Sequence, residues 1–75
     1  MQQYLFNAVL STEQCLSYYS GQIKYVLVTA DSGERIQLHF RHLQPFIDRL
    51  GLRGRFRLTV SKQGAFVRLE KINYS

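Results

Sequence analysis

The stretch 51–60, Gly-Leu-Arg-Gly-Arg-Phe-Arg-Leu-Thr-Val, alternates apolar and cationic side chains with the period of a β-strand. Alternation places successive side chains on opposite faces of a strand. One face then holds Phe56, Leu58 and Val60, and the other holds Arg53, Arg55, Arg57 and Thr59. We therefore expect a strand that contributes core on one side and displays guanidinium groups on the other.

The composition is that of one small domain spanning residues 1–75. The chain has 75 residues, of which 45% are hydrophobic, and a single cysteine, Cys15, which excludes an internal disulfide. The sequence does not open with a secretory signal, and no apolar run approaches the roughly 20 residues that span a bilayer. We expect a cytoplasmic protein with no membrane partner.

Positive charge is concentrated in the second half of the chain. The formal net charge is +5, and residues 35–75 hold nine basic residues against Asp48 and Glu70. Seven of the ten cations are arginines, which bind phosphate and carboxylate groups in planar, bidentate geometry. The electrostatic footprint therefore belongs to residues 35–75.

The first third of the chain predicts a strand and a helix. Residues 4–10 are rich in aromatic and branched side chains and predict a strand with Phe6, Ala8 and Leu10 facing inward. A helix over 12–20 is predicted by a capping box, Ser11 with Gln14, and by Gly21 at its end. We expect its stripe of Cys15, Leu16 and Tyr19 to face the sheet, with Tyr18 lateral.

A hairpin is predicted to follow. Residues 23–30 carry apolar side chains on both faces, which predicts a central strand covered on one side by the helix. Asp31-Ser32-Gly33 forms its turn, and this pairs Val28 with Ile36 and Val26 with Leu38. The returning strand carries Arg35, Gln37, His39 and Arg41 on its other face.

A helical turn and a second hairpin are predicted to complete the fold. Pro45 is suited to start a short helix, which should end near Gly51. Beyond the strand 51–60, residues 61–64 turn the chain into a strand over 65–72. The apolar faces then match if Val60 pairs with Ala65, Leu58 with Val67 and Phe56 with Leu69. The other face would pair Thr59 with Phe66, Arg57 with Arg68 and Arg55 with Glu70.

The predicted fold is mainly β (α+β): a single small antiparallel barrel or roll of five strands. Its order is strand, helix, strand, strand, helical turn, strand, strand. A sheet this short leaves strand edges, and their pairing across a two-fold axis would give a homodimer.

The candidate binding site is the basic strand face. It comprises Arg35, Arg41, Arg53, Arg55, Arg57, Phe66 and Arg68. Cations interleaved with an aromatic ring on β-strands suit single-stranded nucleic acid, RNA in particular. The same face also fits an acidic protein, in which case the domain is a protein–protein interaction module (homodimer or adaptor), or it is simply a solvated basic surface.

Catalytic and metal chemistry lack the residues they need. Cys15, His39 and His42 are too few for a tetrahedral zinc site. The chain also has no serine in a nucleophile elbow and no complete phosphate-binding loop. We expect no enzyme activity, no metal and no cofactor.

Four pieces of the sequence resemble a bacterial family catalogued as domain of unknown function 2835. They are 18–21 (Tyr-Tyr-Ser-Gly), Gly33 with 35–37 (Arg-Ile-Gln), 43–46 (Leu-Gln-Pro-Phe) and 51–56. The resemblance covers nearly the whole chain and implies a bacterial, single-domain, cytoplasmic protein without adding an activity. The family pattern has proline in place of His39 and arginine in place of Gln44, which argues against a family-wide role for either side chain.

Overall fold

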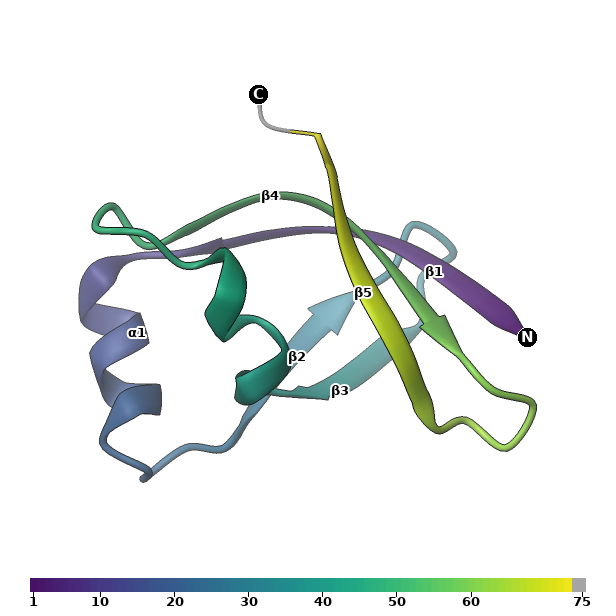
Figure 1. Ribbon diagram of the computed structural model, residues 1–75, viewed down its shortest axis with the longest axis horizontal. Helices are drawn as coiled ribbons and strands as arrows, with labels where there is room; N and C mark the ends of the chain where they lie inside the picture. Colours follow the sequence, from purple (N-terminus) through teal and green to yellow (C-terminus); the bar gives the residue numbers. More distant parts are fainter. Residues whose placement is uncertain (74–75) are drawn as a thin grey trace.

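The computed structural model describes residues 1–73 and shows a mostly β domain with the predicted order of elements. The strands are β1 (Gln2–Leu10), β2 (Tyr25–Thr29), β3 (Arg35–His39), β4 (Leu52–Val60) and β5 (Phe66–Asn73). The helical elements are α1 (Thr12–Tyr19) and two 3-10 turns, η1 (Phe40–His42) and η2 (Gln44–Phe46). Helix α1 lies at one end of the long, curved β1 and β4 (Figure 1).

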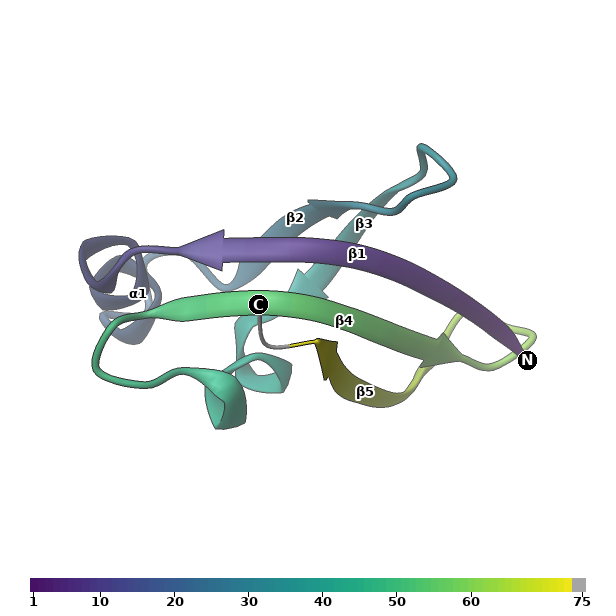
Figure 2. The same ribbon diagram turned by 90° about the horizontal axis from the view of Figure 1, so that it is seen from above.

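The strands form two open sheets, so the expectation of a closed barrel was wrong. One sheet has the order β1-β4-β5 and the other is the β2-β3 hairpin, and both are antiparallel. A bridge between Phe6 and Ala30, with the Asp31 amide donating to the Leu5 carbonyl at 2.8 Å, links the two sheets. Within residues 1–73 no ladder joins β3 to β5. The chain leaves β3 after His39 for the two turns, and Figure 2 shows the turn of the β2–β3 hairpin beyond β1 and β5 beside β4.

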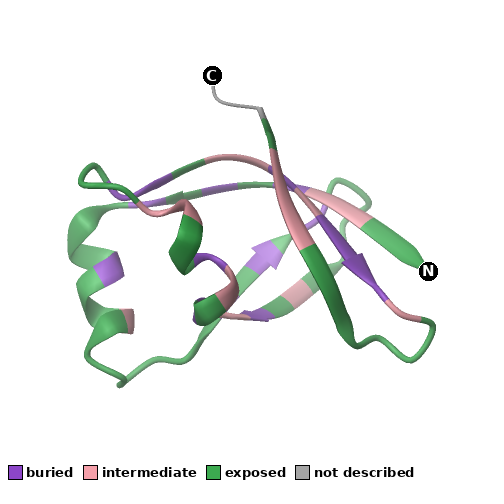
Figure 3. Ribbon diagram, viewed as in Figure 1, coloured by how far each residue is buried: buried purple, intermediate pink, exposed green. Residues whose placement is uncertain are grey.

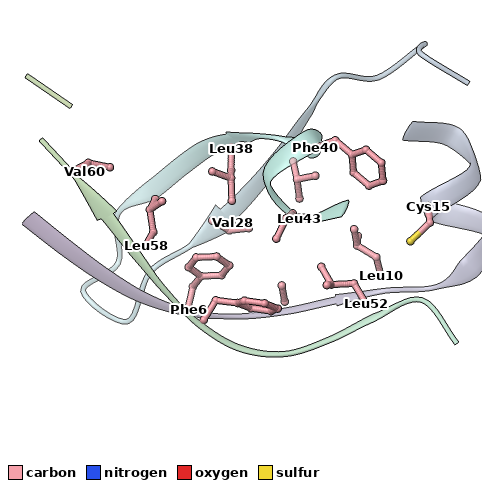
Figure 4. Close-up of a cluster of buried hydrophobic side chains, with 13 residues drawn as sticks. Phe6, Leu10, Cys15, Val28, Leu38, Phe40, Leu43, Leu52, Leu58 and Val60 are labelled. Atoms are coloured by element: carbon pink, nitrogen blue, oxygen red, sulfur yellow. The ribbon is translucent and has the colours of Figure 1, made fainter. Parts of the chain in front are cut away.

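The apolar core lies where the alternation of β1 and β4 predicts it. Phe6 and Phe56 are fully buried and their rings stack with centroids 5.6 Å apart. Ala8, Leu10, Leu58 and Val60 are buried as well. These side chains converge with Leu38 and Leu43 between the two sheets (Figure 4). The inward faces of both strands were therefore predicted correctly.

Helix α1 is capped as predicted but turns a different face to the core. Ser11 and Gln14 form a reciprocal capping box, and Gly21 adopts a φ of 84° after the helix ends. Cys15 is buried, but Leu16 and Tyr19 are more than half exposed, and Tyr18 packs against the core instead. Most of α1 is exposed in Figure 3, so the helix covers the end of the core with one narrow edge.

The β2-β3 hairpin has the predicted turn and register but not the predicted central position. Val28 pairs with Ile36 and Val26 with Leu38. Leu27, on the other face, is 61% exposed. The hairpin is thus a two-stranded sheet with one buried face, which corrects the expectation of a strand covered on both sides.

Gly51 lets the chain pass close to β1 just before β4. Its φ is 102°, and a Cβ at this position would lie 2.1 Å from the carbonyl oxygen of Leu10. Any other residue would force the two backbones apart. The close approach of the Gly51 and Leu10 backbones holds the loop that follows η2 against the end of β1.

The β4–β5 hairpin turns at residues 61–64 as predicted, but its register differs. Val60 pairs with Phe66 and Thr59 with Arg68, so Val67 is an extra, unpaired residue. The first pair of the hairpin is thus already shifted by one residue from the prediction, and the bulge shifts the pairs that follow by one more. Arg57 therefore lies opposite Glu70, not opposite Arg68. A second irregularity between Arg55 and Phe56 then sets Arg55 opposite Asn73, not Glu70.

Among residues 1–73, no helix is long and apolar enough to cross a membrane.

Candidate nucleic-acid interface

The arginine face, formed by Arg53, Arg55, Arg57 and Arg68, lies on the outer side of the three-stranded sheet. Three of its four cations are held by carboxylates or amides of the same chain. Arg57 and Arg68 both place Nε beside Oε1 of Glu70, at 3.2 and 3.3 Å. Arg55 pairs with Asp31 and donates from Nη1 to the Asn7 side chain at 3.2 Å.

The shifted register moves Glu70, which was predicted opposite Arg55, to a position opposite Arg57 and beside Arg68. The hydrogen bond from Arg57, and then the charges of Arg57 and Arg68, hold the pKa of Glu70 below its ordinary value. The carboxylate is therefore ionised at neutral pH and offsets part of the positive charge of both arginines. Arg57 and Arg68, which the predicted register paired with each other, share this carboxylate instead.

Phe66 does not lie on the arginine face. Because it pairs with Val60, it lies on the core side of the sheet, where its ring stacks on His42 with centroids 3.7 Å apart. The predicted pair of Phe66 with Thr59 was wrong, because the register at the turn is shifted by one residue and sets Phe66 opposite Val60. Thr59 itself is 1% exposed, and its Oγ1 has no hydrogen-bond partner among the described residues.

Phe66 instead lines a hollow of about 250 Å³ in the gap between β3 and the β4–β5 hairpin, which we call the gap hollow. A closed barrel would pair β3 with β5 at this place. Buried and half-buried apolar side chains of β3 and β4 line it, namely Ile36, Leu38, Leu58 and Val60. The same hollow is lined by Tyr25, Gln37, His39, Arg41, His42 and Phe66.

Four rings make successive contacts along the gap hollow. The Tyr25 ring meets His39 edge-on, with ring centroids 5.2 Å apart, and the centroids of His39 and His42 are 6.3 Å apart. His42 in turn stacks on Phe66. Tyr25 is 50% exposed and Phe66 is 40% exposed. Rings that are fixed by neighbouring rings and still open to solvent provide flat surfaces on which a planar ligand can stack.

The polar side chains of the gap hollow include one arginine, Arg41, and two histidines. The backbone N–H of Arg41 donates to Nδ1 of His39 at 3.1 Å, so the neutral His39 ring carries its proton on Nε2. Burial, followed by the charge of Arg41 and the presence of His39, lowers the pKa of His42. No aspartate or glutamate lines the hollow, and the Arg41 guanidinium makes no ion pair within residues 1–73.

The structure thus divides the predicted site into two parts. Arg53, Arg55, Arg57 and Arg68 stay together on the arginine face, whereas Arg41 and Phe66 lie at the gap hollow. Arg35 is exposed on β3. It lies on the same strand face as Gln37 and His39, which follow it by two and four residues. Sequence reasoning missed two residues of the gap hollow. The packing of η1 against β5 sets His42 on Phe66, and Tyr25 joins the hollow as the cross-strand partner of His39.

Cys15 is not a candidate nucleophile. It is 3% exposed, and burial raises the pKa of its thiol above the ordinary value. Since the thiolate is the reactive form, this favours the unreactive state. The thiol is part of the core beneath α1.

The fold and the hollow define a small, mostly β domain whose open sheets leave a ring-lined, cationic gap. The family model described as a protein of unknown function (DUF2835) matches residues 2–72. The chain therefore belongs to the DUF2835 family, as the resemblance indicated. No curated protein and no solved structure shows a significant match.

Proposed function

We propose that this domain binds single-stranded nucleic acid, RNA foremost, in the gap hollow. The observation that supports this function best is the row of four contacting rings beside Arg41, which makes no ion pair among the described residues. Unpaired bases stack on aromatic side chains, and arginine pairs with the adjoining phosphates. Base stacking of this kind contributes about 1–3 kcal/mol per base.

The charge distribution supports the gap hollow over the arginine face. On the arginine face, Asp31 and Glu70 already occupy three guanidinium groups, and a phosphate would have to compete with them. At the gap hollow no carboxylate competes for Arg41. The net charge of +5 adds a long-range attraction for polyanions that does not depend on any single contact.

Fluorescence anisotropy with a labelled mixed-sequence RNA of about 12 nucleotides tests the proposal. We expect the wild type to bind in the range of about 1–100 μM at low salt. Tyr25→Leu should weaken binding about tenfold, whereas Tyr25→Phe should retain it, because the second variant keeps the ring. Arg41→Gln should weaken binding and reduce the slope of log K against log salt by about 0.7, the value for one phosphate contact on a single strand.

Arg53→Gln is the matched control, because it removes the same charge from an exposed arginine on the other side of the sheet, one that makes no ion pair within the described part of the chain. If Arg53→Gln and Arg41→Gln weaken binding equally, attraction is a property of overall charge and not of the gap hollow. If the wild type does not bind at about 100 μM, weaker than ordinary non-specific association, nucleic-acid binding is rejected. The alternative is then a protein-interaction module with an acidic partner or a second copy, which the unpaired edge of β5 favours.

A further inference from the structure

A second hollow lies directly beside the first, at the end of α1. It has a volume of about 320 Å³ and is lined by Tyr18, Tyr19, Ile23, Lys24, Phe40 and Arg41, among others. We call it the helix hollow. His39 and Arg41 line both hollows, so the two are adjacent.

The helix hollow has the same chemical character as the gap hollow. Tyr19 is 51% exposed, and its ring meets Phe40 edge-on with centroids 5.2 Å apart. The Tyr18 ring stacks on Phe40, with ring centroids 4.8 Å apart. Phe40 is 5% exposed, so a core residue fixes the ring that is offered to solvent.

Two cations line the helix hollow. Arg41 lines both hollows and Lys24 lines the helix hollow, where the Phe40 amide donates to the Lys24 carbonyl at 2.8 Å and holds the segment before β2 against η1. Neither hollow is lined by aspartate or glutamate. A ligand that occupies both hollows must therefore pass the Arg41 guanidinium, and a phosphodiester is the group that such a position accommodates best.

From these observations we infer that the two hollows form a two-base track, which rests on the proposed function. One base stacks in the gap hollow against Tyr25, the next stacks in the helix hollow against Tyr19, and the phosphodiester between them lies at Arg41 and Lys24. Each hollow is near or below the lower end of the volumes found for drug-sized ligands, about 300 Å³. This size suits a single planar ring system in each hollow.

NMR titration of the full chain with AMP and with the dinucleotide ApA tests the track. We expect AMP to shift the amides around the gap hollow, and ApA to shift these and also the amides of Tyr19 and Lys24. ApA should bind at least tenfold more tightly than AMP, because two stacking contacts share one ligand. ApA shifts confined to the gap hollow would overturn the track and leave the proposed function in place, whereas the absence of any shift with ApA and with a longer RNA would reject both.

Variants give a second, independent measurement. Tyr19→Ala should weaken ApA binding about tenfold while AMP binding is unchanged, and Tyr19→Phe should bind ApA like the wild type. Gln44→Lys adds a cation to the helix hollow and should tighten binding of ApA and longer RNA with a steeper salt dependence. Unchanged ApA affinity in both Tyr19→Ala and Gln44→Lys would contradict the track. The NMR spectrum of each unliganded variant reports whether the fold is retained.

Discussion

Thr59→Val should make this domain more stable, although it removes a polar group from a sheet. Thr59 lies on the central strand β4 and is 1% exposed, and its hydroxyl has no partner within residues 1–73. A buried hydroxyl without a hydrogen bond costs about 1–3 kcal/mol. Valine has nearly the same shape, replaces the hydroxyl with a methyl group and is favoured in strands.

The expected gain is about 1–2 kcal/mol in the free energy of unfolding, taking the lower part of that range because neighbouring groups relax. A domain of 75 residues has a total stability of about 4–11 kcal/mol. The gain is therefore a large fraction of the whole and should raise the melting temperature by about 4–8 °C for each kcal/mol. Urea denaturation followed by circular dichroism measures it as a shift in the midpoint at constant slope.

Two further variants test whether the buried hydroxyl is the cause of the change in stability. Thr59→Ser keeps the hydroxyl and removes the methyl group, so it should destabilise the domain by about 1 kcal/mol. Thr29→Val makes the same chemical change as Thr59→Val at an exposed position of β2 and should stay within about 0.5 kcal/mol of the wild type. If Thr59→Val is less stable than the wild type by more than about 0.5 kcal/mol, the hydroxyl has a partner and the reasoning fails.

Two other predictions concern the core and the gap hollow. Phe56→Ala should lower the free energy of unfolding by about 3–5 kcal/mol, because Phe56 is fully buried between Phe6 and Phe46; a loss below about 1 kcal/mol in urea denaturation would show that its face was misassigned. Since the folded pKa of His42 lies below its ordinary value of 6.5, the unfolded chain binds more protons just below that pH. The free energy of unfolding should therefore fall as the pH decreases from about 7.5 to 5.5. His42→Phe, which keeps a ring against Phe66, should lose less stability over the same pH range. An equal loss in both proteins would assign the effect to another group.

Local patterns in the sequence were sufficient for most of the fold. The alternation in 51–60 placed Phe56 and Leu58 in the core, and the three-residue turn ending at Gly33 set the β2–β3 register. The capping box at Ser11 marked the start of α1. Each of these features is decided by residues within a few positions of one another, so no knowledge of distant contacts was required.

The face of α1 was predicted wrongly because that prediction needed tertiary information. Leu16 and Tyr18 lie two residues apart on a short helix, and either one completes an apolar stripe with Cys15. Phe40 decides between them, because its buried ring stacks on Tyr18. Nothing within 12–20 reveals that partner, which is contributed by η1.

The register of β5 shows how one residue can relocate a candidate site. A regular hairpin would have set Arg57 against Arg68 and left Phe66 among the arginines. A shift of one residue at the turn pairs Phe66 with Val60 on the core side, and the bulge at Val67 adds a second residue of shift that brings Glu70 opposite Arg57. Bulges depend on how the strand packs and twists, which the period of the side chains does not reveal.

The position of Phe66 and the separation of the two sheets have the same structural consequence. With Phe66 on the core side, its ring meets His42 of η1 in the space that a β3–β5 ladder would otherwise fill. The gap between the β2–β3 sheet and the β4–β5 hairpin is thus lined by rings, and no backbone ladder closes it within residues 1–73. On the opposite side of the sheet, Glu70 and Asp31 offset the arginines that first suggested an anionic partner. The hypothesis of a nucleic-acid partner therefore rests on different residues than it did from the sequence: Arg41 is retained, Tyr25 and His42 are added, and the arginine face becomes a source of long-range charge.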